Sequence, residues 1–434
     1  MEEKRSFADR FAEGAAKLGN KIHLKTLRDA FATIMPLYIL AGLAVLVNNV
    51  IFTKLLSGAA LESATYWGNL IVNGTLNISG LMIAPMIGYF LSRNRGFGNP
   101  LAAAIIAIAS LIIMMPGTIT AVPVGAEDAV VLQGVLSFAN LGTNSMFAGI
   151  IIGLLATELF IRISNIKRLR IDLGDSVPQA VGDSFNVLIP VVLSLSIFAI
   201  ISTVLTKCFG TDLIALISTL IQTPLKNVGT SLAGCPILYS LGNLLFTQGI
   251  HQSVIYSSIL EPLLIVNMTE NMAAYMAGDP IPNIINVSMV PGFGMMGGSG
   301  STICLVIATL LFSKYKPSRD IVKMAAIPGV FNINEPMIFG YPIVFNYALV
   351  IPFIAVPALG ITIAYVATAL GLMNPCVVQI PWTTPPLVSG FLATGGDWRA
   401  VVVQAIIIVL GVLIYLPFMK ISEKVQAKML EAEK

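Results

Sequence analysis

The stretch VFNINEPMIFGYPIVFNYALVIPF, residues 330–353, places one carboxylate inside an otherwise apolar sequence. Glu335 is the only formally charged residue between Lys323 and Asp397, and Asn332 and Asn334 precede it. Burying a charge in lipid is costly, so an ionisable residue at such a place indicates a functional site. The alternative is structural, because a carboxylate followed by proline also suits the first turn of a broken helix.

The composition indicates an integral membrane protein. Of 434 residues, 56% are hydrophobic and 11% are charged, whereas soluble proteins carry about 25% charged residues. The net charge of +3 is too small to indicate nucleic-acid binding. The four cysteines lie in or beside apolar runs without C-x-x-C spacing. We expect small hydrophobic fillers there, and neither a disulfide framework, a metal site nor a cofactor.

Apolar runs approaching the roughly 20 residues of a spanning helix recur along the chain. They cover residues 31–52, 69–92, 99–115, 146–161, 184–206, 227–260, 280–313, 336–371 and 400–419. Lysine and arginine cluster in alternate connections, which should be cytoplasmic. This pattern predicts an all-α membrane protein with about ten transmembrane helices, five before about residue 206 and five after it. Both termini are then cytoplasmic.

Two segments do not suit simple spans. Residues 290–303 are rich in glycine, and residues 326–342 hold three prolines among polar residues. Non-helical backbone at membrane depth is tolerated only where protein buries it or where it lines a cavity. We therefore expect two re-entrant hairpins, near 280–300 and 326–343. Amphipathic interfacial helices are expected at 1–30 and at about 163–183, and the first is not a signal peptide.

A second candidate residue, His251, lies in LLFTQGIHQSVIYSSILEP, residues 244–262. Gln248, Gly249 and Gln252 add further polar groups and flexible backbone beside it. The structural alternative is a buried histidine bonded to a carbonyl. Two other acidic residues, Glu158 and Glu261, are expected at a membrane edge.

Two further features suit a polar ligand. Trp382, in QIPWTTPPLVSG, is either an interfacial anchor or a plane for stacking on a sugar ring. GFGMMGGSGST, residues 292–302, includes Gly298 and Ser299 but lacks the G-K-[ST] ending of a phosphate-binding loop. Close approach of its backbone to a ligand, or a hinge, is favoured instead. Neutral amides with one acid and one imidazole suit a polyol or sugar better than an ion.

Five stretches resemble one known family. They are HLKTLRDAFATIMP (23–36), DSVPQAVGDSFNVLIP (175–190), TQGIHQS (247–253), GGSGSTI (297–303) and GVFNINEPMIFGYPIVFNYALVIPF (329–353). Together they resemble the membrane-spanning IIC component of bacterial phosphotransferase-system sugar transporters. The lactose, cellobiose and N,N′-diacetylchitobiose branch is the most similar. The resemblance runs from about residue 20 to 420.

The resemblance implies an organisation and an activity in the bacterial cytoplasmic membrane. A domain of five spans, residues 31–210, forms a homodimer. A second domain, 211–420, with five spans and two re-entrant hairpins, binds sugar and carries it inward by an elevator motion, and residues 421–434 form a cytoplasmic tail. The substrate is a β-linked disaccharide, with N,N′-diacetylchitobiose or cellobiose favoured over lactose. Its 6-hydroxyl receives a phosphoryl group from a phosphocysteine on a separate IIB protein, so IIA and IIB partners are needed.

The resemblance also assigns roles to residues. Glu335 is the candidate base for the 6-hydroxyl, and His251 orients the sugar or steadies charge on the arriving phosphoryl group. Gln248 stands where the family leads us to expect an aromatic or apolar residue. The complete expected sugar-binding set is His251, Glu335, Asn334, Asn332, Gln248, Gly249, Gln252, Trp382, Gly298 and Ser299. Two alternatives stay open: a proton-coupled sugar transporter using Glu335 and His251 as a relay, and a receptor or structural membrane protein.

Overall fold

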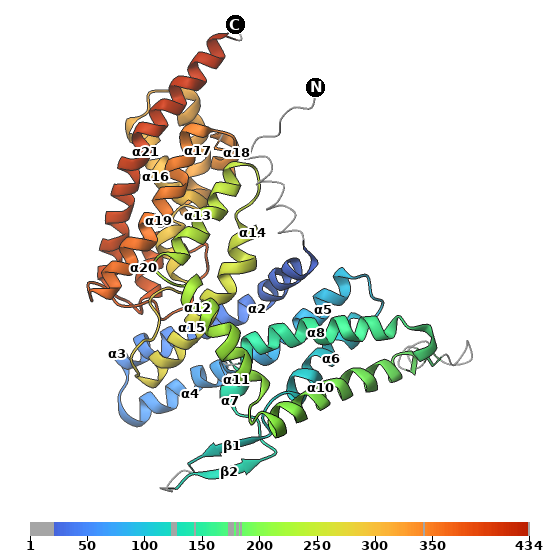
Figure 1. The fold of residues 1–434 in the computed structure, drawn as a ribbon. Helices are drawn as coiled ribbons and strands as arrows, with labels where there is room; N and C mark the ends of the chain where they lie inside the picture. The colour runs from blue at the N-terminus through green and yellow to red at the C-terminus, as the bar shows by residue number, and fades with distance from the viewer. Residues whose placement is uncertain are drawn as a thin grey trace. The chain divides into compact units, whose positions relative to one another are not determined.

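The computed structural model (Figure 1) describes residues 21–432, except 123–127, 143–144, 172–177, 179–181, 183–184 and 342. Helices dominate these residues, which confirms the predicted helical class in its coarse form. The chain divides into two compact units. The amino-terminal unit holds Lys21–Tyr38 and Leu70–Leu225, and the carboxyl-terminal unit holds Ile39–Asn69 and Lys226–Lys434. Helices α2 (Ile22–Leu46), α4 (Gly58–Gly74) and α12 (Thr223–Gly229) contribute to both units.

The core of the amino-terminal unit is made by α5 (Ser79–Asn94), α6 (Pro100–Ile113) and α8 (Met146–Ser164), which pack against one another. Helix α10 (Leu188–Cys208) packs on α6 and α8. Small residues permit this close packing, as is common between membrane helices. A Cβ atom at Gly149 of α8 would lie 2.6 Å from the carbonyl oxygen of Gly80 in α5. A larger side chain at Gly149 would therefore force the two helices apart.

Shorter elements complete this unit. They are η2 (Leu76–Ile78), β1 (Thr118–Ala121), β2 (Val130–Gln133), α7 (Phe138–Leu141), η4 (Lys167–Leu169), α11 (Leu213–Ile217) and the π-helical turn η5 (Ser218–Gln222). Strands β1 and β2 form an antiparallel hairpin with Thr118 opposite Gln133. Our sequence analysis did not predict this hairpin, although threonine, isoleucine and valine favour strands.

In the carboxyl-terminal unit, α19 (Tyr347–Ala369) packs against α13 (Gly234–Thr247) and α21 (Trp398–Ala432). Helix α16 (Ile303–Phe312) packs against α21 and α17 (Lys316–Val330), and Figure 1 shows α16, α19 and α21 side by side. Glycine again allows close contact. A Cβ atom at Gly360 of α19 would lie 2.1 Å from the carbonyl oxygen of Phe293.

Short or broken elements surround these helices. They are η1 (Val47–Phe52), α3 (Thr53–Leu55), α14 (Ser253–Ile255), η6 (Tyr256–Leu260), α15 (Glu261–Ala277), η7 (Val290–Gly294), η8 (Ser299–Ser301), α18 (Glu335–Gly340) and α20 (Val388–Ala393). The breaks divide two of the apolar runs seen in the sequence. The run 227–260 is interrupted at 248–252, and α18 is separated from α19 by residues 341–346.

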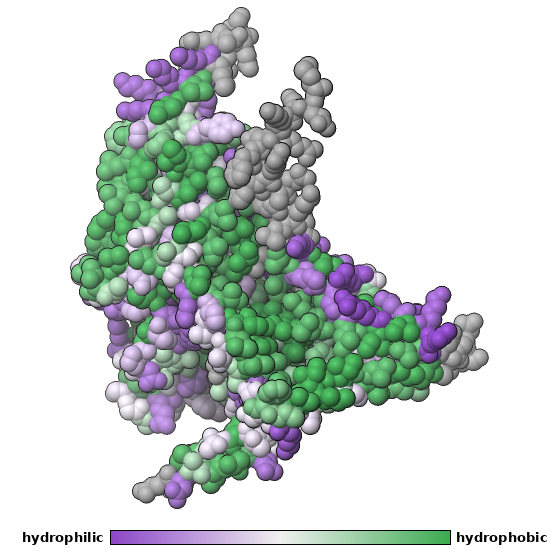
Figure 2. Space-filling model, viewed as in Figure 1, coloured by the Kyte–Doolittle hydropathy of each residue, from purple (hydrophilic) through white to green (hydrophobic). Residues whose placement is uncertain are grey.

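Six of the described helices are long and apolar enough to cross a membrane, and two bent helix pairs raise the number to eight. The six lie in Ile22–Leu55, Gly58–Asn94, Met146–Ser164, Leu188–Cys208, Tyr347–Ala369 and Trp398–Lys428. One bent pair, Val290–Ser301 with Ile303–Phe312, turns by 62°. Figure 2 shows the matching hydrophobic surface, with hydrophilic residues gathered toward its edges. The chain is therefore a multi-pass membrane protein.

Two expected amphipathic helices fall largely outside the described residues. Residues 1–20 are not described, and α2 begins at Ile22. Of the stretch 163–183, residues 163–164 end α8, η4 is a single helical turn, and most residues after 171 are not described. The expected tail 421–434 continues α21 as a helix as far as Ala432.

Candidate functional site

Asn332 joins three segments that are distant in the sequence. It lies in the break between α17 and α18 with φ of 63°, in the left-handed region that asparagine tolerates better than most residues. Its Oδ1 accepts a hydrogen bond from the Gly297 amide at 2.7 Å. Its Nδ2 donates to the Trp382 carbonyl at 2.6 Å and to the Thr384 carbonyl at 3.3 Å. The buried Asn332 side chain is therefore fully engaged with the protein's own backbone.

Asn334 fixes the same break from its other side. Its Nδ2 donates to the Ser299 carbonyl at 2.8 Å and to the Thr302 Oγ1 at 3.0 Å. Gly298, with φ of 96°, lies directly against it, and a Cβ atom there would be 2.3 Å from the Asn334 Cγ. Glycine is required at 298 both by the backbone conformation and by this contact. The glycine-rich loop thus holds the residue that precedes Glu335.

Glu335 is the first residue of α18, and its side chain is exposed. Among the residues that the structure describes, nothing forms a hydrogen bond or ion pair with its carboxylate. Glu335 lies in the first turn of α18, where the helix dipole favours a negative charge without a direct bond, so the structural role is compatible with contact to a ligand. The two oxygens of Glu335 are available to a ligand.

His251 lies in the turn between α13 and α14, and its exposed ring has one nitrogen already engaged. Its Nδ1 accepts from the Ser253 amide at 3.2 Å and lies 2.9 Å from the Ser253 Oγ. Because the backbone amide can only donate, a neutral His251 carries its proton on Nε2, which becomes a hydrogen-bond donor. The ring also lies against Phe246, with centroids 4.7 Å apart. The imidazole is thus oriented by its own turn.

The His251 turn and the Glu335 segment belong to one site. The Glu335 carboxylate interacts electrostatically with the His251 imidazole. The Phe345 amide, beyond α18, donates to the Thr247 carbonyl at 2.8 Å. Gly249, with φ of 85°, would place a Cβ atom 3.7 Å from the Phe345 ring.

The two glutamines of the turn have different surroundings. The buried Gln252 places its Nε2 3.9 Å from the Met295 sulfur in the glycine-rich segment. Gln248 is partly exposed, and its Nε2 donates to the Thr247 hydroxyl at 3.3 Å. Its amide oxygen has no partner among the described residues. Both glutamines therefore keep an amide oxygen without a partner in the described structure, and Gln248 is the more exposed of the two.

All ten residues predicted from the sequence lie in the carboxyl-terminal unit. The contacts above join the segments 247–252, 295–302, 332–335, 343–345 and 382–384. Trp382 is 52% exposed at the edge of this group. The Glu335 carboxylate can accept a hydrogen bond from a sugar hydroxyl, and the His251 Nε2–H can donate one to a sugar oxygen. The carboxylate can also remove the hydroxyl proton if the two come within hydrogen-bond distance.

The sequence analysis missed the residues that support this site. Ser253 orients His251, Thr302 accepts from Asn334, and Tyr415 of α21 donates to the Gly300 carbonyl at 2.6 Å. Asn271 and Asn286 both donate to the Cys376 carbonyl at 2.9 Å. In the sequence, each of these residues is only a polar residue within an apolar run. That pattern does not indicate which group the side chain bonds.

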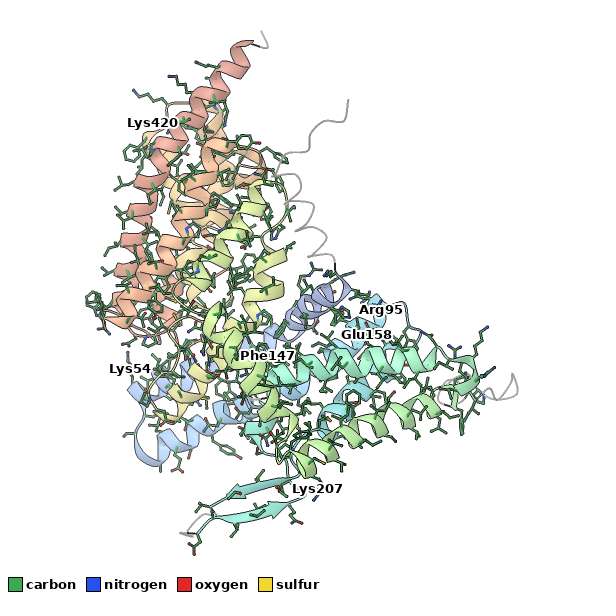
Figure 3. The ribbon with its side chains drawn as sticks, in the orientation of Figure 1. Lys54, Arg95, Phe147, Glu158, Lys207 and Lys420 are labelled. Atoms are coloured by element: carbon green, nitrogen blue, oxygen red, sulfur yellow. The ribbon has the colours of Figure 1, made fainter. Side chains whose placement is uncertain are left out.

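A cluster of charged and ionisable side chains lies in the amino-terminal unit, with Glu158 half-buried and its partners exposed. Glu158 of α8 accepts from the Arg95 Nε at 3.0 Å and bonds the His23 Nε2 at 3.0 Å. Figure 3 shows the Arg95 and Glu158 side chains next to each other. Both Glu158 partners are cationic or can become so. This carboxylate is therefore neutralised by the protein itself.

Comparisons with known proteins identify the family. The model of the family "Phosphotransferase system, EIIC" matches residues 28–357. The lichenan permease IIC component of Bacillus subtilis (strain 168) is 31% identical over 418 residues, covering 95% of this chain and 92% of that protein. The oligo-beta-mannoside-specific EIIC component of the same organism is 32% identical, covering 94% of this chain and 92% of that protein.

A cellobiose-specific EIIC component from Geobacillus stearothermophilus is 30% identical, covering 98% of this chain and 95% of that protein. The crystal structure of the transporter ChbC, the IIC component from the N,N′-diacetylchitobiose-specific phosphotransferase system, superposes with a TM-score of 0.90. It is 30% identical, and the match covers 96% of this chain and 98% of that chain. The predicted family is confirmed: this chain belongs to the EIIC family of phosphotransferase-system sugar transporters.

Proposed function

We propose that the chain is the permease for a β-linked disaccharide and presents the sugar 6-hydroxyl for phosphorylation. The relatives named for lichenan, oligo-β-mannosides and cellobiose support a β-linked sugar. The similarity to ChbC supports an N-acetylated disaccharide as one candidate. N,N′-Diacetylchitobiose and cellobiose are favoured, and lactose is the third candidate. The chain is thus the membrane part of a phosphocysteine–sugar phosphotransferase, which needs IIB as donor and IIA upstream.

The observation that carries the proposal is the exposed Glu335 carboxylate, which has no partner among the described residues and whose charge acts on His251. Glu335 accepts a hydrogen bond from the 6-hydroxyl and takes its proton as the phosphoryl group arrives. His251 donates from Nε2 to the sugar or to a phosphoryl oxygen. Such a base is expected to contribute about 10²–10⁴ in rate.

The remaining site residues have two kinds of proposed role. Gln248, Gln252 and the Gly249 backbone lie beside His251 and contact the sugar, and the half-exposed Trp382 stacks on a ring. Asn332 and Asn334 act chiefly by position, because their amide NH2 groups already bond the protein's backbone. Gly298 and Ser299 hold Asn334 and bring the loop backbone close to the ligand.

The proposed architecture follows the sequence analysis. It has about ten spans, re-entrant hairpins near 280–300 and 326–343, and both termini in the cytoplasm. The domain 31–210 forms a homodimer, and the domain 211–420 carries the sugar across by an elevator motion. The breaks at η7, η8 and α18 support non-helical backbone beside the site.

Transport into proteoliposomes tests the function. We expect labelled cellobiose or N,N′-diacetylchitobiose to accumulate as its 6-phosphate only when phosphorylated IIB is inside. A proton gradient without IIB should give no accumulation. Accumulation of unmodified sugar with the gradient alone would instead establish a proton-coupled transporter. A receptor or structural protein would do neither. Calorimetry with a panel of β-linked disaccharides then ranks the substrates.

A further inference from the structure

In the carboxyl-terminal unit, residues 371–397 run between α19 and α21 as a hairpin. At its base, the Nη1 group of Arg399 donates to the Gly371 carbonyl at 3.1 Å. Farther along, the Val377 amide of the first arm donates to the Ala393 carbonyl of the second arm, α20, at 2.8 Å. Val377 and its neighbours in the first arm are buried and non-helical. Such backbone is tolerated at membrane depth where protein surrounds it, so the hairpin is a fixed part of the unit.

The tip of this hairpin is a tight turn that carries Trp382. The Thr384 amide and hydroxyl both donate to the Pro381 carbonyl, at 3.0 and 2.7 Å, and these bonds fix the turn. The carbonyls of Trp382 and Thr384 accept from a residue outside the hairpin, Asn332. The Trp382 side chain is 52% exposed. The position of its indole is therefore set by the turn and by the bonds from Asn332.

Asn332 combines three properties that hold the tip in place. With φ of 63°, its backbone lies in the left-handed region, where glycine, asparagine and aspartate are the residues best tolerated. Its Oδ1 accepts from the Gly297 amide at 2.7 Å, which fixes the orientation of the side chain. Its Nδ2 carries two N–H groups, one for each of the Trp382 and Thr384 carbonyls. Aspartate would keep the first two properties and lose the third.

Asn332 is also close to the candidate base. Glu335 follows it by three residues, which span at most about 10 Å. Between them, Asn334 is held by the Ser299 carbonyl at 2.8 Å, so this short stretch of chain is fixed as well. Asn332 thus joins the Glu335 segment directly to the turn that carries Trp382. The spacing between the carboxylate and the indole depends on this one buried side chain.

We propose that Asn332 is a positioning residue through which the site selects a disaccharide over a monosaccharide, an inference that rests on the proposed function. Glu335 binds the 6-hydroxyl of one sugar ring, and Trp382, held at a set spacing by Asn332, stacks on the other ring. A monosaccharide occupies only the Glu335 side and gains nothing from the position of Trp382. Asn332 therefore contributes to specificity without contacting the sugar.

The kinetics of disaccharide phosphorylation test the proposal, with the purified full-length protein, phosphorylated IIB, and cellobiose or N,N′-diacetylchitobiose as substrate. For Asn332→Asp we expect KM to rise about tenfold with kcat nearly unchanged, because the lost contact is to the ring that does not react. The inhibition constant of the matching monosaccharide, glucose or N-acetylglucosamine, should stay the same. A monosaccharide constant that weakens as much as the disaccharide KM overturns the proposal.

Two further variants keep the result interpretable. Asn332→Gly tolerates the same φ and adds no charge near Glu335, so it should give the same rise in KM and covers the case in which Asn332→Asp fails to fold. Asn267→Asp is the matched control, because Asn267 is a buried asparagine whose Nδ2 donates to the Ile285 carbonyl at 2.7 Å and not to the hairpin tip. It should leave both KM and kcat unchanged.

A double-mutant cycle shows whether Asn332 acts through Trp382. Trp382→Ala alone should raise the disaccharide KM by a similar factor, since it removes the same contact. In the Trp382→Ala background, Asn332→Asp should then have little further effect. An equal rise in KM with and without Trp382, or a fall in kcat in place of the rise in KM, overturns the proposal. Absence of phosphorylation by the wild type would instead contradict the proposed function.

Discussion

Glu335 in the carboxyl-terminal unit and Glu158 in the amino-terminal unit both interrupt apolar sequence, yet their surroundings are opposite. Glu158 bonds Arg95 and His23, and its side chain is 17% exposed. Glu335 is exposed and has no partner among the described residues. A carboxylate that the protein neutralises contributes to packing, whereas one left free beside a hydrogen-bond donor is available for a ligand. The hydrogen-bond partners of each carboxylate, and not its position in an apolar run, therefore distinguish the structural role of Glu158 from the ligand-binding role proposed for Glu335.

The largest expected effect is on Glu335. We predict that Glu335→Gln lowers the rate of sugar 6-phosphorylation at least 100-fold, because the amide cannot take the hydroxyl proton. Sugar affinity should change only a few-fold, and the melting temperature should not change, since no bond within the described protein is lost. Glu62→Gln, at an exposed glutamate of α4, is the control. Full phosphorylation by Glu335→Gln at matched expression would remove Glu335 from the role of base.

A smaller effect is expected at His251. His251→Ala should weaken sugar binding about tenfold, the loss expected for one hydrogen bond of about 1.4 kcal/mol. His251→Gln should retain most of the affinity, because its amide nitrogen can donate from about the same place as Nε2. Calorimetry on the purified protein measures both variants. If the alanine and glutamine variants bind sugar equally, the donor role of Nε2 is wrong.

Glu158 should give the opposite pattern. Glu158→Gln is predicted to lower the free energy of unfolding by about 1–2 kcal/mol, because a partly buried group loses its charged hydrogen bonds. Sugar affinity and phosphorylation should stay within about twofold of the wild type. Thermal unfolding in detergent measures the loss, and the double variant with Arg95→Gln should be less destabilised than the sum of the two singles. Strict additivity would contradict a direct Glu158–Arg95 interaction.

Much of the fold class and the place of the site could be predicted from the sequence. The composition indicated membrane helices, and the prolines and glycines around Asn332 and Gly298 indicated breaks in them. The structure has broken helices at both places. The number of spans is harder to predict from the sequence, because hydropathy does not show where an apolar helix bends or ends early. Six to eight candidate spans stand among the described residues, against about ten expected.

The roles within the site could not be predicted in the same way. The sequence grouped Asn332, Asn334 and Glu335 as similar ligand-facing residues. In the structure, the Asn332 amide reaches a carbonyl 50 residues away, and Asn334 reaches one 35 residues away. Such bonds depend on tertiary packing, so a pattern of neighbouring residues cannot distinguish them from free groups. The β1–β2 hairpin was missed for a related reason, since short strands have little periodicity to detect.

Asp397, a third carboxylate, extends the comparison with the smallest expected effect. It lies in the turn between α20 and α21, where its oxygens accept from the Asn374 amide at 2.7 Å and from the Arg399 Nε at 2.9 Å. Burial alone raises the pKa of Asp397. The bonds from the Arg399 side chain and from the Asn374 and Arg399 amides together lower it by more than burial raises it, so the pKa lies below its ordinary value of 3.8. Asp397 therefore resembles Glu158 in being satisfied by the protein.

A carboxyl whose pKa is lower in the folded state stabilises the protein above its unfolded pKa, and this contribution is lost as the pH falls through the folded value. Asp397→Asn should therefore lower the melting temperature at pH 7, by an amount corresponding to about 1 kcal/mol or less. The difference from wild type should shrink as the pH falls from about 5 towards 3. Asp320→Asn, at an exposed aspartate of α17, is the control and should change the melting temperature little at any pH. A difference for Asp397→Asn that persists undiminished at pH 3 would show that Asp397 acts through packing or through neutral hydrogen bonds. Only Glu158 would then remain as the charged, internally paired counterpart of Glu335.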